Sequence, residues 1–178
     1  MTPLKPAARE AASNVKRLEV LKDLVASGPL NAYAILDGAV VAGLLGELSG
    51  SEHAALLAGA LTPDLAEVSP YVVAMAPDDA VLELIAKSWD LPWGIFAFSE
   101  ASFQVVSRHF RQIFTVHDEA GKPMLFRFYD PRVLPVFLEA STPAEIDEVF
   151  GPAGAFMLTG EGVGLVRLAR KDGKLVKS

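Results

Sequence analysis

The sequence predicts a single α/β domain with an α+β tendency, in which helices pack on a mixed β-sheet. Short apolar runs alternate with helical patterns up to about residue 110, which is typical of βαβ units. Hairpin signals dominate after that point, and a long helical pattern precedes the first apolar run. The length of 178 residues suits one domain that buries roughly 70% of its unfolded surface.

The first half is expected to open with a helix and to continue into buried strands. Apolar residues recur at helical spacing between residues 5 and 27, and Gly28-Pro29 ends this pattern. The runs 33–36, 71–75 and 93–98 are apolar throughout, as in strands that are covered on both faces. Weaker patterns predict a helix at 39–48, a short strand at 53–57, a capped helical turn at Thr62-Pro63 and a helix after Pro77-Asp78.

A long amphipathic helix is expected at the start of the second half. Ser99 is its predicted cap, and its inner stripe is Phe103, Val106, Phe110, Ile113 and Phe114. A hairpin follows, with strands at 115–118 and 124–129. Asp130-Pro131 is predicted to cap a helix that Pro135 keeps short or kinked.

The last part of the chain carries one more helix and a β-rich tail. Thr142, Pro143 and Glu145 form a capping box, and Gly151-Pro152 ends the helix it starts. Strands are expected at 156–158 and 165–168, and an Asp172-Gly173 turn returns the last strand at 175–176. We divide the chain into an N-terminal helical segment (1–30), a main domain (31–152) and a C-terminal β-rich tail packed on the same domain (153–178).

Composition excludes several classes of function. The chain has no cysteine, which rules out disulfides, zinc–thiolate sites and thiol catalysis. A net charge of −6 argues against nucleic acid and against anionic membrane surfaces as partners. No run reaches the roughly 18 apolar residues that a membrane span needs, so we expect a cytoplasmic protein. The hydrophobic content of 51% fits either an alanine-rich core or an apolar surface patch that a partner covers.

No motif in the sequence indicates a catalytic, metal or cofactor site. His53, His109 and His117 lack metal-ligand spacing on any one element, and no serine stands in a Gly-x-Ser-x-Gly elbow. The glycine-rich run 160–164 leads into a β pattern instead of a helix, so we interpret it as a turn between strands. We therefore expect no enzyme activity and no cofactor.

Two charged groups are candidates for contact with a partner. Arg108, His109 and Arg111 form a basic patch, which is either a solvated helix face or a docking site for an acidic partner. The run Arg127-Phe128-Tyr129-Asp130-Pro131-Arg132 predicts a brace at a strand-to-helix corner. There one arginine would pair with Asp130 in a bidentate manner, and the Tyr129 hydroxyl would need a partner if buried. A catalytic Asp130 is the alternative.

The segment LFRFYDPRVL at 125–134 resembles the signature of the type VI secretion effector-adaptor, or chaperone, family, long catalogued as a domain of unknown function. Further segments resemble the family in the same order. They are YAILDGA at 33–39, SPYVVAMAP at 69–77, WGIFAFS at 93–99 with Trp93 and Gly94, SRHFRQIFTV at 107–116 and FGP at 150–152. The resemblance covers about residues 31 to 152.

The resemblance implies an adaptor without a reaction of its own. Such proteins hold a toxic effector in the bacterial cytosol and load it onto the VgrG (valine–glycine repeat) spike protein. The implied partners are therefore the N-terminal region of an effector and the spike protein. Many relatives have a longer C-terminal lobe, whereas only about two dozen residues follow Gly151-Pro152 here.

Two surfaces are candidates for binding an effector segment. One is an exposed sheet edge within 156–176, and the other is the N-terminal helix, if it leaves the domain to pack on a partner. Two other functions stay open from the sequence. One is an immunity protein that inhibits a toxin domain, and the other is a small hydrolase or transferase that uses Asp130.

Overall fold

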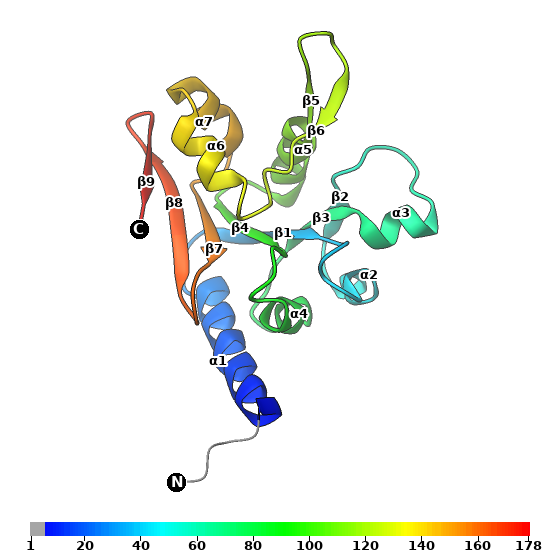
Figure 1. The fold of residues 1–178 in the computed structure, drawn as a ribbon, viewed down its shortest axis with the longest axis vertical. Helices are drawn as coiled ribbons and strands as arrows, with labels where there is room; N and C mark the ends of the chain where they lie inside the picture. The colour runs from blue at the N-terminus through cyan, green and yellow to red at the C-terminus, as the bar shows by residue number, and fades with distance from the viewer. Residues whose placement is uncertain (1–5) are drawn as a thin grey trace.

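The protein is described by a computed structural model that covers the backbone from residue 6 and the side chains from residue 10, up to residue 178. A seven-stranded sheet has the order β2-β3-β1-β4-β7-β8-β9, and helices cover both of its faces (Figure 1). The strands are β1 (Asn31–Asp37), β2 (His53–Ala55), β3 (Pro70–Ala74), β4 (Gly94–Ser99), β7 (Ala155–Thr159), β8 (Leu165–Lys171) and β9 (Lys174–Lys177). A separate hairpin of β5 (Thr115–His117) and β6 (Pro123–Leu125) projects from the body.

The helices form one layer on each side of the sheet. They are α1 (Pro6–Ala26), α2 (Leu44–Glu47), α3 (Pro63–Val68), α4 (Val81–Lys87), α5 (Phe103–Phe114), α6 (Leu134–Ala140) and α7 (Pro143–Phe150), with a 3-10 turn η1 (Leu48–Gly50). Among the described residues, no helix combines the length and the apolar character that crossing a membrane requires. The predicted fold class is confirmed: helices pack on a sheet, with a helix at the start and a hairpin at the end.

Every strand pairing in the sheet is antiparallel, including β1 with both β3 and β4. The expected βαβ units are therefore wrong. The runs were apolar at every position because helices cover both faces of the sheet. An apolar residue at every position of a strand indicates that both faces of the strand are covered, but it does not indicate the direction of the strand.

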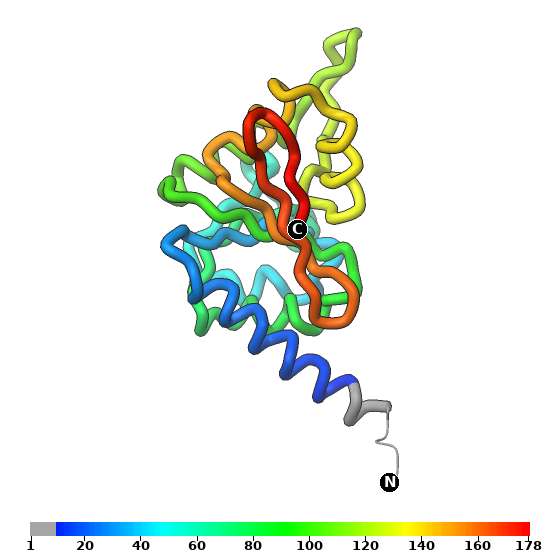
Figure 2. Tube along the Cα trace, turned by 90° about the vertical axis from the view of Figure 1, so that its left-hand side faces the viewer, coloured from blue at the N-terminus to red at the C-terminus, as the bar shows by residue number. Residues whose placement is uncertain are grey.

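Successive residues of β1 point to two separate cores. Tyr33 and Ile35 join the upper core under α5, α6 and α7, while Ala34 and Leu36 join the lower core over α1, α2 and α4. Figure 2 shows α1 on the opposite side of the sheet from α6 and α7. One sheet thus separates two hydrophobic layers, and it connects them through its strands.

The structure corrects several local predictions. Ser99 ends β4 and donates to the carbonyl of Pro152, so the helix cap is Ser102 instead, without a side-chain hydrogen bond. Residues 39–48 hold mostly turns before the four-residue α2. The second hairpin strand stops at Leu125, because the chain turns toward the sheet from residue 126 onward. Lys5, the expected start of the first helix, lies outside the described residues.

Other local predictions are confirmed. The capping box of Thr142 and Glu145 starts α7, and Thr62 accepts a hydrogen bond from the backbone N–H of Leu65 at the start of α3. Asp172 and Gly173 both adopt positive φ, as a two-residue hairpin turn requires. The inner stripe of α5 is buried as expected.

The N-terminal helix packs on the domain. Leu21 is fully buried and Val25 is nearly so in the lower core, while Arg17 pairs with Asp90 beyond α4 at 2.7 Å. The Arg17 guanidinium also lies 5.7 Å from the ring centroid of Trp89. These contacts anchor α1, so the hypothesis that its inner stripe packs on a partner finds no support in the structure.

Candidate functional site: an arginine–aspartate cluster beside an apolar helix

The RFYDPR motif forms a corner between β6 and α6, centred on the buried carboxylate of Asp130. Arg132 holds that carboxylate in a bidentate manner: its Nε donates to Oδ1 at 2.9 Å and its guanidinium NH2 donates to Oδ2 at 2.7 Å. Oδ1 also accepts the backbone N–H of Arg132. The carbonyl of Asp130 accepts the N–H groups of Val133 and Leu134, which starts α6. The predicted bidentate corner brace is confirmed, with Arg132 as the partner.

Asp130 differs from the prediction in one respect. The residue before the first turn of α6 is Val133, so Asp130 lies three residues before the N-cap. Pro131 occupies the turn between them, where its fixed φ suits the tight reversal of the chain. Asp130 therefore organises a turn that leads into the helix, instead of capping the helix directly.

Arg127 connects this corner to the sheet. Its guanidinium donates to Oδ2 of Asp37 at 2.7 Å and lies 3.7 Å from Oδ2 of Asp130. Asp37 is the last residue of β1, and its backbone N–H donates to the carbonyl of Trp93. The ion pair ties together segments that are 90 residues apart in sequence.

The sequence analysis did not single out Asp37 and missed this ion pair. The available signal was a carboxylate directly after a buried strand. Such a group needs a cationic partner, and the arginine-rich motif offers one.

The aromatic residues of the motif fix its position. Phe128 is fully buried, with its ring centroid 5.2 Å from that of Phe110 on α5. Tyr129 is buried as well, and the Arg127 guanidinium lies 5.7 Å from its ring centroid. Burial raises the pKa of the Tyr129 hydroxyl, and the nearby carboxylate of Asp37 raises it further. The hydroxyl therefore stays protonated at neutral pH.

The ion pairs set the charge state of the cluster. Hydrogen bonds from the Arg132 side chain hold the pKa of the Asp130 carboxyl below its usual value, although burial acts in the opposite direction. The Asp130 carboxylate is thus buried and ionised, and the side chains of Asp37 and Asp130 are only 5% and 3% exposed. The Arg127 and Arg132 side chains are 48% and 68% exposed. The cluster therefore presents cationic N–H groups to the solvent.

The outer face of α6 next to this cluster is apolar and exposed. Val133, Val136 and Phe137 are 38%, 66% and 36% exposed, whereas Leu134 and Leu138 on the inner face are buried. The Phe137 ring lies 4.6 Å from that of Phe126, measured between centroids, which links α6 to the base of the β5–β6 hairpin. There Val116, Met124 and Leu125 are also exposed. We call Val133, Val136 and Phe137 the α6 surface.

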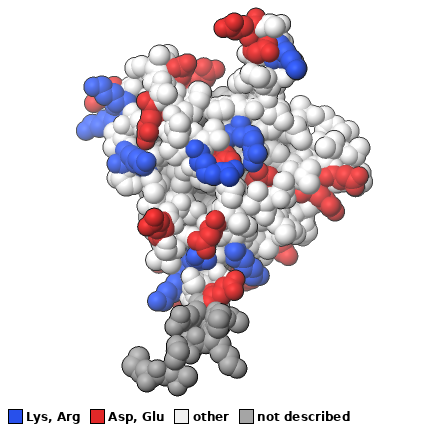
Figure 3. Space-filling view, in the orientation of Figure 1, with Lys and Arg blue, Asp and Glu red and all other residues white. Residues whose placement is uncertain are grey.

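Figure 3 shows the same arrangement on one face of the molecule. Blue atoms surround a small red area there, and white atoms extend around them. Arginine is enriched among the residues that contribute most to protein interfaces, and contiguous exposed apolar side chains mark sites of protein interaction. The sequence LPVFLEA contained a signal for this surface. Six of its seven residues are apolar, whereas a helix of this length that buries only one face needs fewer apolar residues.

Trp93 and Gly94 of the resemblance serve the sheet. Trp93 is fully buried and packs edge-on against Phe96 in the lower core. Gly94 has φ of 147°, and a Cβ there would overlap the carbonyl oxygen of Ile35 on the neighbouring strand. This close approach of β4 to β1 requires glycine. Trp93 and Gly94 are both buried, so neither is available for contact with a partner.

The predicted basic patch on α5 is divided by the structure. Arg108 and Arg111 share a shallow hollow with Gln104, and Arg111 donates to the carbonyl of Ala55 at 2.7 Å. His109 points elsewhere, with Nε2 3.3 Å from the carbonyl oxygen of Val149 on α7. Burial lowers the pKa of the His109 imidazole, against the effect of that hydrogen bond. His109 is therefore a packing residue, and only the two arginines face solvent together.

Two further segments have structural roles. The run 160–164 joins β7 to β8 as a turn, as expected. Asp79 accepts hydrogen bonds from the Ser51 hydroxyl and from the N–H of Val81, at the start of α4. Within the part of the chain that the structure describes, no three histidine or acidic side chains are grouped as metal ligands.

Comparison with known proteins gives one match. A family model described as a domain of unknown function (DUF4123) matches residues 32–148, about two thirds of the chain. No curated protein and no solved structure matches the sequence significantly. The matched range begins in β1 and ends in α7, so it contains both the arginine–aspartate cluster and the α6 surface.

Proposed function

The chain belongs to the DUF4123 family, and we propose that it acts as a non-catalytic adaptor of type VI secretion. In this role it binds a secreted effector in the bacterial cytosol, at the effector's N-terminal region, and helps load it onto the VgrG spike protein. The resemblance of residues 125–134 to the signature of effector adaptors supports the choice of partners.

A single observation carries the proposal: the α6 surface is apolar, exposed and bordered by two arginines. A helix that only covers a core needs one apolar face, yet α6 has apolar residues on its inner and outer faces. Buried Asp37 and Asp130 hold the arginines in place, so little side-chain entropy is lost when a partner binds.

The same geometry favours binding over catalysis at Asp130. Its carboxylate oxygens accept three hydrogen bonds from Arg132, and a general base needs a free lone pair within reach of substrate. The lowered pKa also makes Asp130 a poor proton acceptor at neutral pH.

The first test is purification of the tagged protein from its native host, with bound proteins identified by mass spectrometry. We expect a large toxin-like protein or a spike subunit. Val136→Asp should reduce recovery of that partner at least tenfold, because it places a charge in the centre of the α6 surface. Val136 is 66% exposed, so the variant should keep the melting temperature of the parent.

Val68→Asp is the matched control. Val68 is 50% exposed at the end of α3, away from α6 (Figure 1), and its replacement should leave recovery unchanged. Equal recovery by both variants would refute the role of the α6 surface, and a chain that retains no specific partner even after mild crosslinking would refute the adaptor function.

Two further measurements separate the adaptor from its rivals. An immunity protein would bind the toxin domain and block its activity, whereas an adaptor should bind the N-terminal region and leave the activity unchanged. A hydrolase or transferase would lose turnover in Asp130→Asn while keeping its stability, which is the opposite of what a corner brace predicts.

A further inference from the structure

The last strand of the sheet has a free edge with defined hydrogen-bonding groups. β9 ends the strand order, and its only partner in the described sheet is β8. The N–H of Arg167 donates to the carbonyl of Ser178 and the reverse bond is also present, which fixes the alternation of the ladder. The backbone N–H and C=O groups of Lys174 and Val176 therefore point toward β8. The N–H and C=O groups of Leu175 and Lys177 point away from it.

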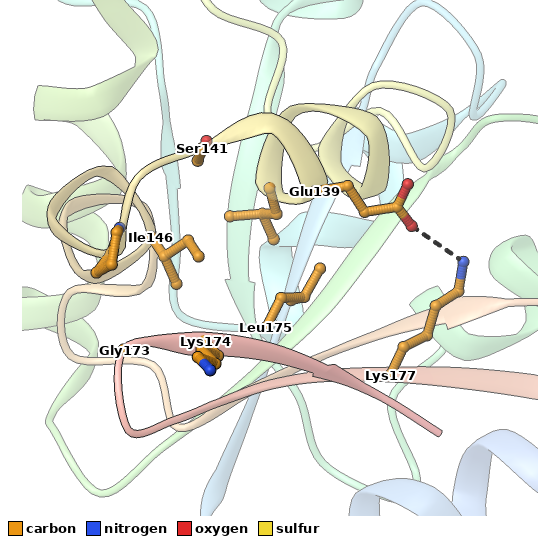
Figure 4. A pocket seen from close by; sticks show the side chains of 9 residues that line it. Glu139, Ser141, Ile146, Gly173, Lys174, Leu175 and Lys177 are labelled. Atoms are coloured by element: carbon orange, nitrogen blue, oxygen red, sulfur yellow. Dashed lines mark ion pairs between the residues drawn. The ribbon is translucent and has the colours of Figure 1, made fainter.

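A hollow of about 420 Å³ lies along this free edge, between β9 and the helices α6 and α7. Ile146 of α7 and Leu175 of β9 point into it (Figure 4), and Leu138 of α6 is a further apolar residue of its lining. Lys177 Nζ reaches across one end to Glu139 Oε1 at 3.7 Å. Both side chains are more than half exposed, so this ion pair is weak and can open.

The β8–β9 hairpin is strongly cationic in an otherwise acidic protein. Residues 165–178 contain five basic side chains and one acidic one, while the whole chain has a net charge of −6. The basic residues are Arg167, Arg170, Lys171, Lys174 and Lys177. Blue side chains gather along this side of the molecule in Figure 3. Lysines on an edge strand oppose pairing with a like-charged edge, so a second copy of β9 does not fit here.

We propose that the free edge of β9 is a strand-addition site for an extended acidic and apolar segment of the partner protein. The main chain of that segment pairs with Leu175 and Lys177 and extends the sheet by one strand. An apolar side chain opposite Leu175 fills the hollow. An acidic side chain opposite Lys177, on the same face, replaces Glu139. The identity of the partner as an effector or spike rests on the proposed function, whereas the chemistry of the site does not.

The test uses the full chain, labelled with ¹⁵N, and a short threonine-rich peptide as the probe. The peptide carries one valine and one glutamate two positions apart, so that both side chains lie on the same face of an added strand. We expect binding in the micromolar to millimolar range, with slowed hydrogen exchange at the amides of Leu175 and Lys177. The same peptide with lysine in place of glutamate is the control and should not bind. The site is refuted if the glutamate peptide fails to bind at millimolar concentration, or if it protects other amides instead.

Three variants identify the contacts. Lys177→Glu should weaken peptide binding at least tenfold, and Glu139→Gln should strengthen it up to about fivefold because Lys177 is released from its ion pair. Leu175→Pro removes an N–H that points away from β8, so the fold tolerates it but the added strand loses a donor. Leu175→Val is its control and should bind with little change. Unaltered affinity in both Lys177→Glu and Leu175→Pro would overturn the proposal.

The variants also separate this site from the proposed function. If the native partner is still recovered by Lys177→Glu and Leu175→Pro, the adaptor function stands and the strand-addition site is wrong. If no partner is recovered but the peptide protects Leu175 and Lys177, the site stands and the adaptor function is wrong.

Discussion

The buried carboxylates of Asp37 and Asp130 hold the corner of the RFYDPR motif by pairing with Arg127 and Arg132, respectively. Their ion pairs are intramolecular, and they leave the outer sides of Arg127 and Arg132 open to solvent. Under the proposed function, structural and binding roles therefore coexist in the same side chains. A substitution at Asp130 should therefore lower the stability of the fold directly. It should affect the binding of a partner only indirectly, by changing the positions of the two arginines.

Asp130→Asn should lower the free energy of unfolding by about 1.5–3 kcal/mol at pH 7, the usual value of hydrogen bonds to charged groups. The folded pKa of Asp130 lies below its unfolded value. Its contribution is therefore fully present above the unfolded pKa near 4 and is lost as the pH falls through the folded pKa. Urea unfolding of both proteins should show a difference that shrinks below about pH 4. A difference independent of pH would contradict this account.

Gly94→Ala tests a second requirement at the residue scale. The new Cβ would overlap the carbonyl oxygen of Ile35 and sit at a φ that L side chains rarely adopt. We expect a loss of about 1–3 kcal/mol, as in overpacked cores. Gly46→Ala is the control, because a Cβ there has open space within α2 and should be neutral or slightly stabilising. Thermal unfolding compares the two variants directly.

At the scale of elements, the short helices depend on their first residues. α7 is only eight residues long, and both hydrogen bonds of its capping box are present. Thr142→Ala removes the acceptor for the N–H of Glu145 and should cost about 0.5–2 kcal/mol. Chemical denaturation measures this loss. Thr62→Ala on α3, which buries no residue, should cost less, and an equal or larger loss there would contradict the argument.

The sequence predicted elements well where the signal was local. The capping box at Thr142, the turn at Asp172-Gly173 and the inner stripe of α5 each follow from neighbouring residues. Strand direction and the partner of Arg127 depend on segments far apart in the chain, so no local pattern specifies them. A bidentate pair at Asp130 was predictable because Arg127 and Arg132 both lie within three positions of it, but only the structure identifies Arg132 as the partner.

On the scale of the whole molecule, one sheet couples two cores. The upper core lies under α5, α6 and α7 and contains the motif, while the lower core contains α1, Trp89 and Trp93. Both binding surfaces proposed above use elements of the upper layer or the sheet edge. The lower layer therefore supports them only through the strands.

This coupling predicts that the two cores unfold together. Leu21→Ala in the lower core and Leu134→Ala in the upper core each remove a fully buried leucine and should cost about 2–5 kcal/mol. Both tryptophans report on the lower core, so their fluorescence follows its unfolding. If the sheet couples the two cores, the stability lost in Leu134→Ala affects both of them. The unfolding midpoint from tryptophan fluorescence should then shift as much as the midpoint from far-ultraviolet circular dichroism. A tryptophan transition unmoved by Leu134→Ala would mean that the layers unfold separately, with α1 and its core as an independent unit.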